Sequence, residues 1–342
     1  IFLVFYNLWY TAMKKWITSN YHYMVPEFDA TSAVKPDFGT FLASVQRGID
    51  KVGVQRAVPV VMGPVSMIHF TKFQDTAVNQ RDAVMQALVP VYLSLIQSLT
   101  DMGIQEIQIH EPALVFDDAS LVPYFGLAYP AILPKRGGPR INMVAFMDDV
   151  GKNNYQWLCS IPEISMLSMD FTRGDSLGLV EKFGFPANKI LGVGLLDSRS
   201  VWKAQPDVVV PVLAKLSAVG VIAIRIQPSG SLHYLPWDLT NENKASLEHP
   251  AAPVLSFATQ KLDEIANVAK FAKGQAKEIG HEAAWKAFSQ TVGVNQNVKD
   301  RIRALTEDDF TRTESYEQRR PKQLKGLPIL PTTTIGSFPQ TK

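Results

Sequence analysis

Short apolar runs recur along the chain, and stretches with apolar residues at helical spacing lie between them. The runs that we predict as strands are Ala57–Met62, Ile104–Leu114, Ile141–Phe146, Ile164–Phe171, Lys189–Leu196 and Val219–Ile226. Helices are predicted at Arg81–Met102, Asn153–Ser160, Ser176–Phe185 and Asp207–Ala218. Because the strand runs are apolar throughout and alternate with helices, we expect an α/β protein with a parallel sheet. The number of β/α units in this length favours a (β/α)8 TIM-type barrel over an open sheet.

The pattern changes after Pro253. Residues 254–272 are predicted to form one long helix, and residues 273–320 are polar and mostly helical in pattern. Prolines, a glycine and lysines mark residues 321–331 as a linker, and a strand-like run, TTTIGSF, begins at Thr332. We therefore predict a barrel over residues 1–272, incomplete at its N-terminus, a helical and proline-rich linker over 273–331, and the first strand of a second barrel over 332–342.

The first ten residues, IFLVFYNLWY, are almost wholly apolar. A membrane-spanning helix needs about 20 apolar residues, and a signal peptide has a basic start that this segment lacks. We therefore expect a buried strand or helix here, and Ile1–Tyr10 could take the place of the missing first barrel strand.

The net charge and the cysteine count limit which partners and which cellular compartment we expect. The formal net charge of the 342 residues is only +2, so neither nucleic acid nor a membrane surface is an expected partner. The single cysteine, Cys159, excludes a disulfide and a multi-cysteine zinc site within these residues. We expect a cytoplasmic protein, because a single thiol is typical of reducing compartments, and we expect a monomer.

Polar side chains gather where four of the predicted strands end, which is where barrel enzymes place their active residues. They are His110, Glu111, Asp170, Arg173, Asp197, Ser198, Arg199, Gln227, Ser229, Ser231 and His233. Two histidines and two carboxylates from this set could bind a metal ion. The alternative is a set of rim salt bridges and loop hydrogen bonds. The spacings match no known metal motif.

A second candidate site lies near the N-terminus, where Asn20-Tyr21-His22-Tyr23 follows Lys15. Aromatic rings and a lysine would suit a flat heteroaromatic ligand that carries carboxylates. The alternative is a packed aromatic loop with a snorkelling lysine. Farther along, Gly63-Pro64 is predicted as a turn after a strand, and the chain has no glycine-rich phosphate loop.

Six segments, taken in order, resemble the cobalamin-independent methionine synthase family. They are KKWITSNYHYMVPEF (Lys14–Phe28), MGPVS (Met62–Ser66), IQIHEPAL (Ile107–Leu114), GLLDSRSVW (Gly194–Trp202), SGSLHYLPWDL (Ser229–Leu239) and LPTTTIGSFPQT (Leu330–Thr341). The resemblance implies two (β/α)8 barrels joined by a linker. This chain would cover most of the N-terminal barrel, the linker and the first strand of the catalytic barrel.

The resemblance also implies a reaction, in which the methyl group of 5-methyltetrahydropteroyl-polyglutamate passes to homocysteine and gives methionine. The family uses zinc rather than cobalamin, and the zinc ion holds homocysteine as the nucleophilic thiolate. Its ligands are His, Cys, Glu and Cys in the catalytic barrel, and none of these positions lies in this chain. No catalytic residue and no metal ligand is therefore expected here, and the chain alone is expected to be inactive.

Some substrate contacts of the family do fall on these residues. Lys15 matches a lysine that contacts the folate, and Asn20 and His22 are candidates because they lie near it in sequence. Ile335, Gly336 and Ser337 match the segment that holds the amino-acid part of homocysteine.

The chain also departs from the family pattern. The glycine- and arginine-rich N-terminal segment is missing, and Ile1–Thr11 looks unlike the family. His110 stands where the family usually has Asp, and Gly230 stands where a Cys is common. Two other functions stay open. One is a stand-alone, non-catalytic barrel paralogue that binds folate or a partner, and the other is a metal-dependent barrel hydrolase that uses His110, Glu111 and His233.

Overall fold

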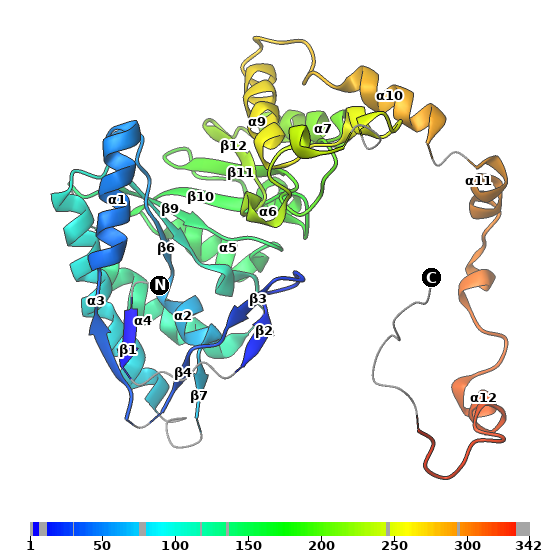
Figure 1. Ribbon diagram of the computed structural model, residues 1–342. Helices are drawn as coiled ribbons and strands as arrows, with labels where there is room; N and C mark the ends of the chain where they lie inside the picture. Colours follow the sequence, from blue (N-terminus) through cyan, green and yellow to red (C-terminus); the bar gives the residue numbers. More distant parts are fainter. Residues whose placement is uncertain are drawn as a thin grey trace. The chain divides into compact units, whose positions relative to one another are not determined.

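The computed structural model describes residues 3–6, 12–29, 31–74, 80–116, 118–134, 137–243, 247–292 and 295–332. The chain divides into two compact units, Ile1–Phe288 and Ser289–Lys342. Figure 1 shows both units, and each is described by itself.

The larger unit is built on a six-stranded parallel sheet. Its strands are β6 (Val60–Met62), β8 (Glu106–His110), β9 (Arg140–Val144), β10 (Ile164–Asp170), β11 (Ile190–Leu196) and β12 (Ile224–Pro228). Each strand pairs with the next one in chain order, from β6 to β12 (Figure 1). A doubly wound sheet would reverse its strand order at a switch point. The sequential order is the one expected for the wall of a barrel, and it differs from that of a doubly wound sheet.

An ion pair shows that the sheet is curled. Arg225 of β12 donates from Nη2 to Oε2 of Glu106 on β8 at 3.0 Å, although three strands lie between them. At about 4.8 Å per strand, a flat sheet would separate β8 and β12 by roughly 19 Å, too far for these side chains to meet. The sheet thus bends as a barrel wall does. In the described residues β6 and β12 do not pair, so the predicted eight-unit closed barrel is confirmed only as a curled parallel sheet.

The concave face of this sheet is polar. Ser168 Oγ of β10 lies 2.8 Å from Asn142 Oδ1 of β9 and 3.2 Å from Gln227 Oε1 of β12. These side chains meet across β11 because Gly192 has no side chain, and a Cβ there would lie 2.0 Å from Ser168 Oγ. The convex face instead carries the buried apolar side chains, such as Leu167 and Val193, that pack against helices.

Helices surround the sheet. They are α1 (Gly39–Val52), α2 (Pro64–Phe70), α3 (Arg81–Asp101), α4 (Val122–Ile132), α5 (Gly151–Ser160), α6 (Ser176–Phe183), α7 (Pro206–Ala218), α9 (Ala258–Ala272) and α10 (Glu282–Thr291), with short 3-10 turns η2 (Pro112–Val115), η3 (Ala119–Leu121), η4 (Leu232–Tyr234), η5 (Leu239–Asn241) and η6 (Ala252–Val254). By length and composition α3 could cross a membrane, but its Leu88 and Leu99 are fully buried in the core of this unit.

The sequence prediction missed three of these helices and was wrong about one turn. The missed helices are α1, α2 and α4. Gly63-Pro64 is predicted as a turn, whereas Gly63 is the N-cap of α2 and Pro64 is its first residue. Proline is favoured at that position because the first helical N–H has no partner inside the helix.

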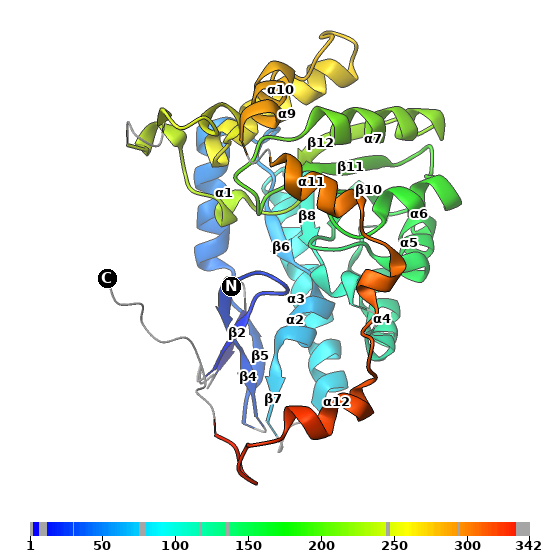
Figure 2. The ribbon, with the colours of Figure 1, turned by 90° about the vertical axis from the view of Figure 1, so that its right-hand side faces the viewer.

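The short N-terminal strands lie together at one end of the larger unit in both views (Figures 1 and 2). They are β1 (Leu3–Tyr6), β2 (Met13–Lys15), β3 (His22–Met24), β4 (Glu27–Phe28), β5 (Ala33–Pro36) and β7 (Lys72–Phe73). Leu3–Tyr6 pair antiparallel with β5 and not with a strand of the central sheet. The hypothesis that Ile1–Tyr10 replaces the first barrel strand is therefore wrong for this part of the segment.

The smaller unit is helical and exposed. It contains α11 (Gln296–Arg303), η7 (Glu307–Phe310) and α12 (Tyr316–Gln323). The side chain of Asn295 caps α11, and Ser315 forms a capping box with Gln318 at the start of α12. α12 runs into the segment predicted as a proline-rich linker and includes Pro321. The predicted strand that begins at Thr332 lies almost wholly outside the described residues.

Candidate functional site

The predicted folate-contact residues lie on a short β-hairpin made of β2 and β3. Lys15 pairs with His22, and Met13 pairs with Met24. Because directly opposed residues project from the same face, these four side chains share one face of the hairpin. All four are exposed, Met13 by 73% and Met24 by 56%. The hairpin thus presents a cation, an imidazole and two thioethers to the outside.

The opposite face of the hairpin is anchored by an aromatic residue. Tyr23 packs on Phe70 with a ring-centre distance of 5.5 Å and on Trp16 at 5.6 Å. Burial raises the pKa of Tyr23 above its usual range, which is already well above neutral pH. Lys14 pairs with Tyr23 and therefore projects away from the exposed Lys15 face.

The two strands are joined by a tight turn. The Trp16 N–H donates to the Tyr21 carbonyl at 2.7 Å, and Ser19 Oγ donates to the Trp16 carbonyl at 2.7 Å. Asn20 lies exposed in this turn, close to both strand ends. The structure therefore brings Lys15 and His22 together and places Asn20 near them, as the sequence suggests.

The turn lies over the carboxyl ends of the central strands. Trp16 and Ile17 pack against a cluster made of Val144, the last residue of β9, and Phe146 and Met147 just beyond it. Arg199, just after β11, donates from Nη1 to Thr18 Oγ1 at 2.9 Å. This is the end of a barrel where substrates usually bind. In this chain the hairpin covers part of it with its own aromatic and apolar side chains.

A second site, which is buried, lies where the MGPVS and IQIHEPAL segments meet at Glu111. Its carboxylate accepts from the Ser66 N–H at 2.6 Å and the Val65 N–H at 3.2 Å, and also from Ser66 Oγ and the Tyr129 hydroxyl. Burial raises the pKa of Glu111 to about 7, against the lowering effect of these hydrogen bonds. A Cβ on Gly63 would lie 2.1 Å from Glu111 Oε2. Glu111 therefore holds the start of α2 and is not free to bind a ligand.

The other strand-end groups also have partners within the protein. Arg173 makes two bonds to Asp197, at 3.0 and 3.2 Å, and Asp170 accepts from the backbone and hydroxyl of Thr172. Ser198 and Ser229 lie 3.3 Å apart through their hydroxyls. These contacts are the rim salt bridges and loop hydrogen bonds of the alternative interpretation.

The histidines of the proposed metal site are not brought together with a carboxylate. Burial lowers the pKa of His110 to about 4, so its ring is neutral, and its Nε2 lies 3.3 Å from Gln108 Oε1. His233 is exposed on η4. In the part of the chain that the structure describes, no three His, Cys, Asp or Glu side chains are grouped to hold a metal ion. The hydrolase hypothesis based on His110, Glu111 and His233 therefore has no support here.

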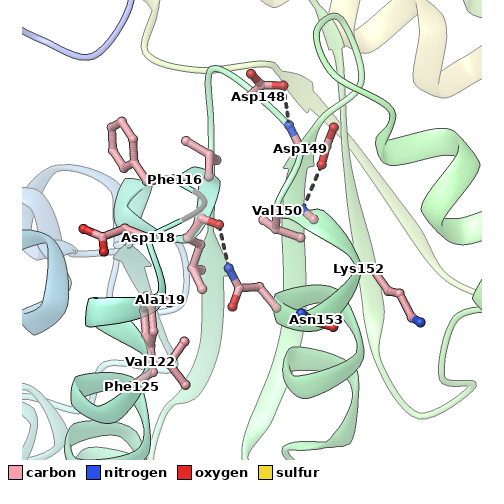
Figure 3. Close-up of a pocket in the computed structure, with 14 residues that line it drawn as sticks. Phe116, Asp118, Ala119, Val122, Phe125, Asp148, Asp149, Val150, Lys152 and Asn153 are labelled. Atoms are coloured by element: carbon pink, nitrogen blue, oxygen red, sulfur yellow. Dashed lines mark hydrogen bonds between the residues drawn. The ribbon is translucent and has the colours of Figure 1, made fainter.

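A cavity of about 560 Å³, which sequence reasoning did not predict, lies near the ends of β8 and β9 (Figure 3). Phe116, Val122 and Phe125 form its apolar side, and Asp148 and Asp149 lie on the other side. Asp149 is already engaged, since it accepts from the backbone N–H groups of Gly151 and Asp175. The pair of aspartates after a strand gave no distinctive sequence signal.

Comparisons with known proteins agree with the motifs. Residues 7–220 match the model of the family described as "Cobalamin-independent synthase, N-terminal domain". The chain belongs to this family. It is 40% identical over 334 residues to the 5-methyltetrahydropteroyltriglutamate–homocysteine methyltransferase of Trichodesmium erythraeum and 32% identical over 333 residues to that of Lactococcus lactis. Each alignment covers 96% of this chain but only 43% of the relative.

A solved structure supports the fold of this cobalamin-independent synthase domain. The putative vitamin-B12 independent methionine synthase from Listeria monocytogenes aligns with a TM-score of 0.52 over 73% of each chain. The sequence identity is 14%, so this likeness concerns the fold alone. The three predicted homocysteine contacts, Ile335, Gly336 and Ser337, all lie outside the described residues, and their role stays a prediction.

Proposed function

We propose that this chain is the N-terminal part of an enzyme that transfers the methyl group of 5-methyltetrahydropteroyl-polyglutamate to homocysteine. Membership of the family and the names of the relatives support this reaction. The chain spans about two fifths of the length of those relatives. In this proposal the reacting groups belong to the remainder of the complete protein. In this proposal the complete enzyme is a cytoplasmic monomer whose curled sheet closes into a (β/α)8 barrel.

The exposed face of the β2–β3 hairpin carries the proposed role of this chain. Lys15 would donate to a carboxylate of the folate's glutamate tail, and a lysine is well suited to this because its ammonium is a compact charge with three donors. His22 and Asn20 would add hydrogen bonds beside it. The observation that supports this role is that Lys15 and His22 are paired on one exposed face.

Zinc would act in the remainder of the enzyme, where it would hold the homocysteine thiolate. The described residues of this chain do not fit a zinc site. Glu111 is saturated by internal donors, and Cys159 is half-buried beside Tyr155, where burial raises the pKa of its thiol. Ile335, Gly336 and Ser337 would bind the amino-acid part of homocysteine once the catalytic barrel is complete.

A methyl-transfer assay tests the proposed function. The complete protein, supplied with zinc, homocysteine and 5-methyltetrahydropteroyl-triglutamate but no cobalamin, should form methionine. The 342-residue chain in the same mixture should form none above the rate without enzyme, because the thiolate that attacks the methyl group must be held by a metal. Chelator-sensitive methionine formation by the chain alone would contradict the division of roles, and an inactive complete protein would contradict the reaction itself.

A further inference from the structure

The turn of the β2–β3 hairpin is strained where it meets the central sheet. Among the described residues, only two that are not glycine have a left-handed φ, Ile17 at 53° and Met147 at 77°. A β-branched residue in this region is a genuine outlier. Met147 belongs to a small apolar cluster with Val144 and Phe146, and Ile17 packs against this cluster. Such strain persists only where the surroundings hold it, and it tends to occur at ligand-binding sites.

Arg199 holds this turn from the loop after β11. Its guanidinium donates from Nη1 to Thr18 Oγ1 at 2.9 Å and from Nη2 to the Thr18 carbonyl at 3.1 Å. Thr18 directly follows the strained Ile17. Tyr21 and Tyr234 add a ring contact at 4.9 Å across the same junction. The hairpin is therefore tied to the loops after β11 and β12 at its turn.

The charge of Arg199 is not used in an ion pair within the described residues. The neighbouring carboxylate, Asp197, makes its two side-chain bonds to Arg173 and accepts only the backbone N–H of Arg199. Because the acceptors on Thr18 are neutral, we infer that Arg199 acts here through its shape. Its rigid guanidinium can bind two acceptors at once.

The hairpin needs such an anchor. Each of its strands has three residues, and an isolated two-stranded hairpin is at best marginally stable in water. Thr18 is three residues from Lys15 and four from His22, so the two bonds from Arg199 fix the end of the hairpin nearest to the proposed folate contacts.

We propose that Arg199 is a positioning residue for the folate subsite, which it serves by holding the turn at Thr18 so that Lys15 and His22 keep their places. This inference rests on the proposed function of the Lys15 face. Arg199 need not contact the substrate. It should affect the folate requirement through Lys15 and leave homocysteine unaffected.

The test uses the complete two-barrel enzyme with the variants Arg199→Ala, Arg199→Lys and Thr18→Val. Arg199→Ala should raise the KM for 5-methyltetrahydropteroyl-triglutamate about tenfold, the effect of losing charge-assisted hydrogen bonds, with kcat and the KM for homocysteine unchanged. Arg199→Lys and Thr18→Val each keep one of the two bonds and should give smaller increases. Lys203→Ala is the matched control, because Lys203 donates to the Pro253 carbonyl at 2.8 Å away from the hairpin. It should change neither KM.

A double-mutant cycle separates positioning from direct contact. If Arg199 acts through Lys15, Arg199→Ala should have little further effect in an enzyme that already carries Lys15→Ala. Multiplying effects of the two substitutions would overturn the proposal, since Arg199 would then act on the substrate independently. An Arg199→Ala enzyme with the parent's folate KM would also overturn it, provided that Lys15→Ala alone weakens folate binding.

Hydrogen exchange tests whether Arg199 anchors the hairpin, and this test does not depend on whether the hairpin binds folate. Backbone amides between Lys14 and Tyr23 should exchange faster in Arg199→Ala than in Lys203→Ala or the parent, because the turn has lost its anchor. If Lys15→Ala leaves the folate KM unchanged, the proposed folate role fails, and a loosened hairpin in Arg199→Ala would still support the anchoring part. Unchanged exchange in Arg199→Ala would overturn the anchor itself.

Discussion

At the scale of single residues, Glu111 lies where two segments far apart in the sequence meet. It accepts hydrogen bonds from Val65 and Ser66, and Ser66 Oγ in turn accepts from the Ala113 N–H at 2.8 Å. The Gly63 N–H donates to the His110 carbonyl at 2.8 Å. The MGPVS and IHEPAL motifs are therefore two halves of one buried junction, which accounts for their polar residues without any role in catalysis.

This junction leaves no room for a side chain at position 63. We predict that Gly63→Ala destabilises the chain by about 2–4 kcal/mol, because overpacking a buried polar junction is among the most damaging substitutions. Its new Cβ would lie 2.1 Å from Glu111 Oε2 and 2.8 Å from the Tyr129 hydroxyl. Gly48→Ala, in α1, meets no atom within 4 Å and should stabilise by about 0.5–1 kcal/mol. Urea unfolding of the two variants measures both changes in stability. Equal unfolding midpoints for Gly63→Ala and Gly48→Ala would contradict the account.

Glu111 and His110 should have opposite effects on how stability depends on pH. The pKa of Glu111 is raised from 4.5 to about 7, so the folded chain binds an extra proton in this window and its stability falls as pH rises. The pKa of His110 is lowered from 6.5 to about 4, so its contribution to stability rises with pH between these values. The two contributions largely cancel in the parent.

Removing the carboxylate should expose the histidine contribution. Glu111→Gln is expected to be less stable than the parent, because an amide cannot accept four donors, yet its stability should rise from pH 5 to 7 relative to the parent. The raised pKa corresponds to about 3 kcal/mol across the full window. Free energies of unfolding at pH 5, 6 and 7 measure the change, and parallel pH profiles for variant and parent would contradict the assigned pKa.

At the scale of elements, periodicity predicted the central strands and several helices, because buried parallel strands and amphipathic helices leave a clear pattern. The prediction for α3 ends within one residue of the observed Asp101. By contrast, α4 is apolar on nearly all sides and shows no helical period, and α2 has only seven residues. The helix α1 does carry Phe41, Val45 and Ile49 at helical spacing and could have been predicted.

The hairpin marks the limit of what local pattern can predict. Resemblance pointed to Lys15, and proximity in sequence pointed to His22, but nothing in the pattern predicts three-residue strands. Their stability comes from contacts with residues more than 40 positions away, such as Phe70, and from Arg199, 181 positions from Thr18. The strain at Ile17 is likewise a product of tertiary packing and is invisible in the sequence.

At the scale of the whole molecule, our proposal gives this chain the role of a scaffold that carries part of the folate site. Among its described strand-end charges, Arg173 and Asp197 pair with each other, and its hairpin lies over the end of the sheet where a barrel enzyme would bind substrate. Among the described residues, the hairpin face with Lys15 and His22 is exposed and chemically suited to a ligand. The central claim is that this face contributes to folate binding in the complete enzyme.

The most direct measurement of that claim compares Lys15→Ala with Lys14→Ala in the complete enzyme. Both substitutions remove one exposed lysine from the same strand, but only Lys15 shares the face of His22. The account predicts that Lys15→Ala raises the KM for 5-methyltetrahydropteroyl-triglutamate about ten- to a hundredfold, the effect of losing a charge-assisted hydrogen bond of about 1.5–3 kcal/mol. Lys14→Ala should leave this KM unchanged, and neither should alter the KM for homocysteine. Equal folate KM values for Lys15→Ala, Lys14→Ala and the parent would contradict the claim.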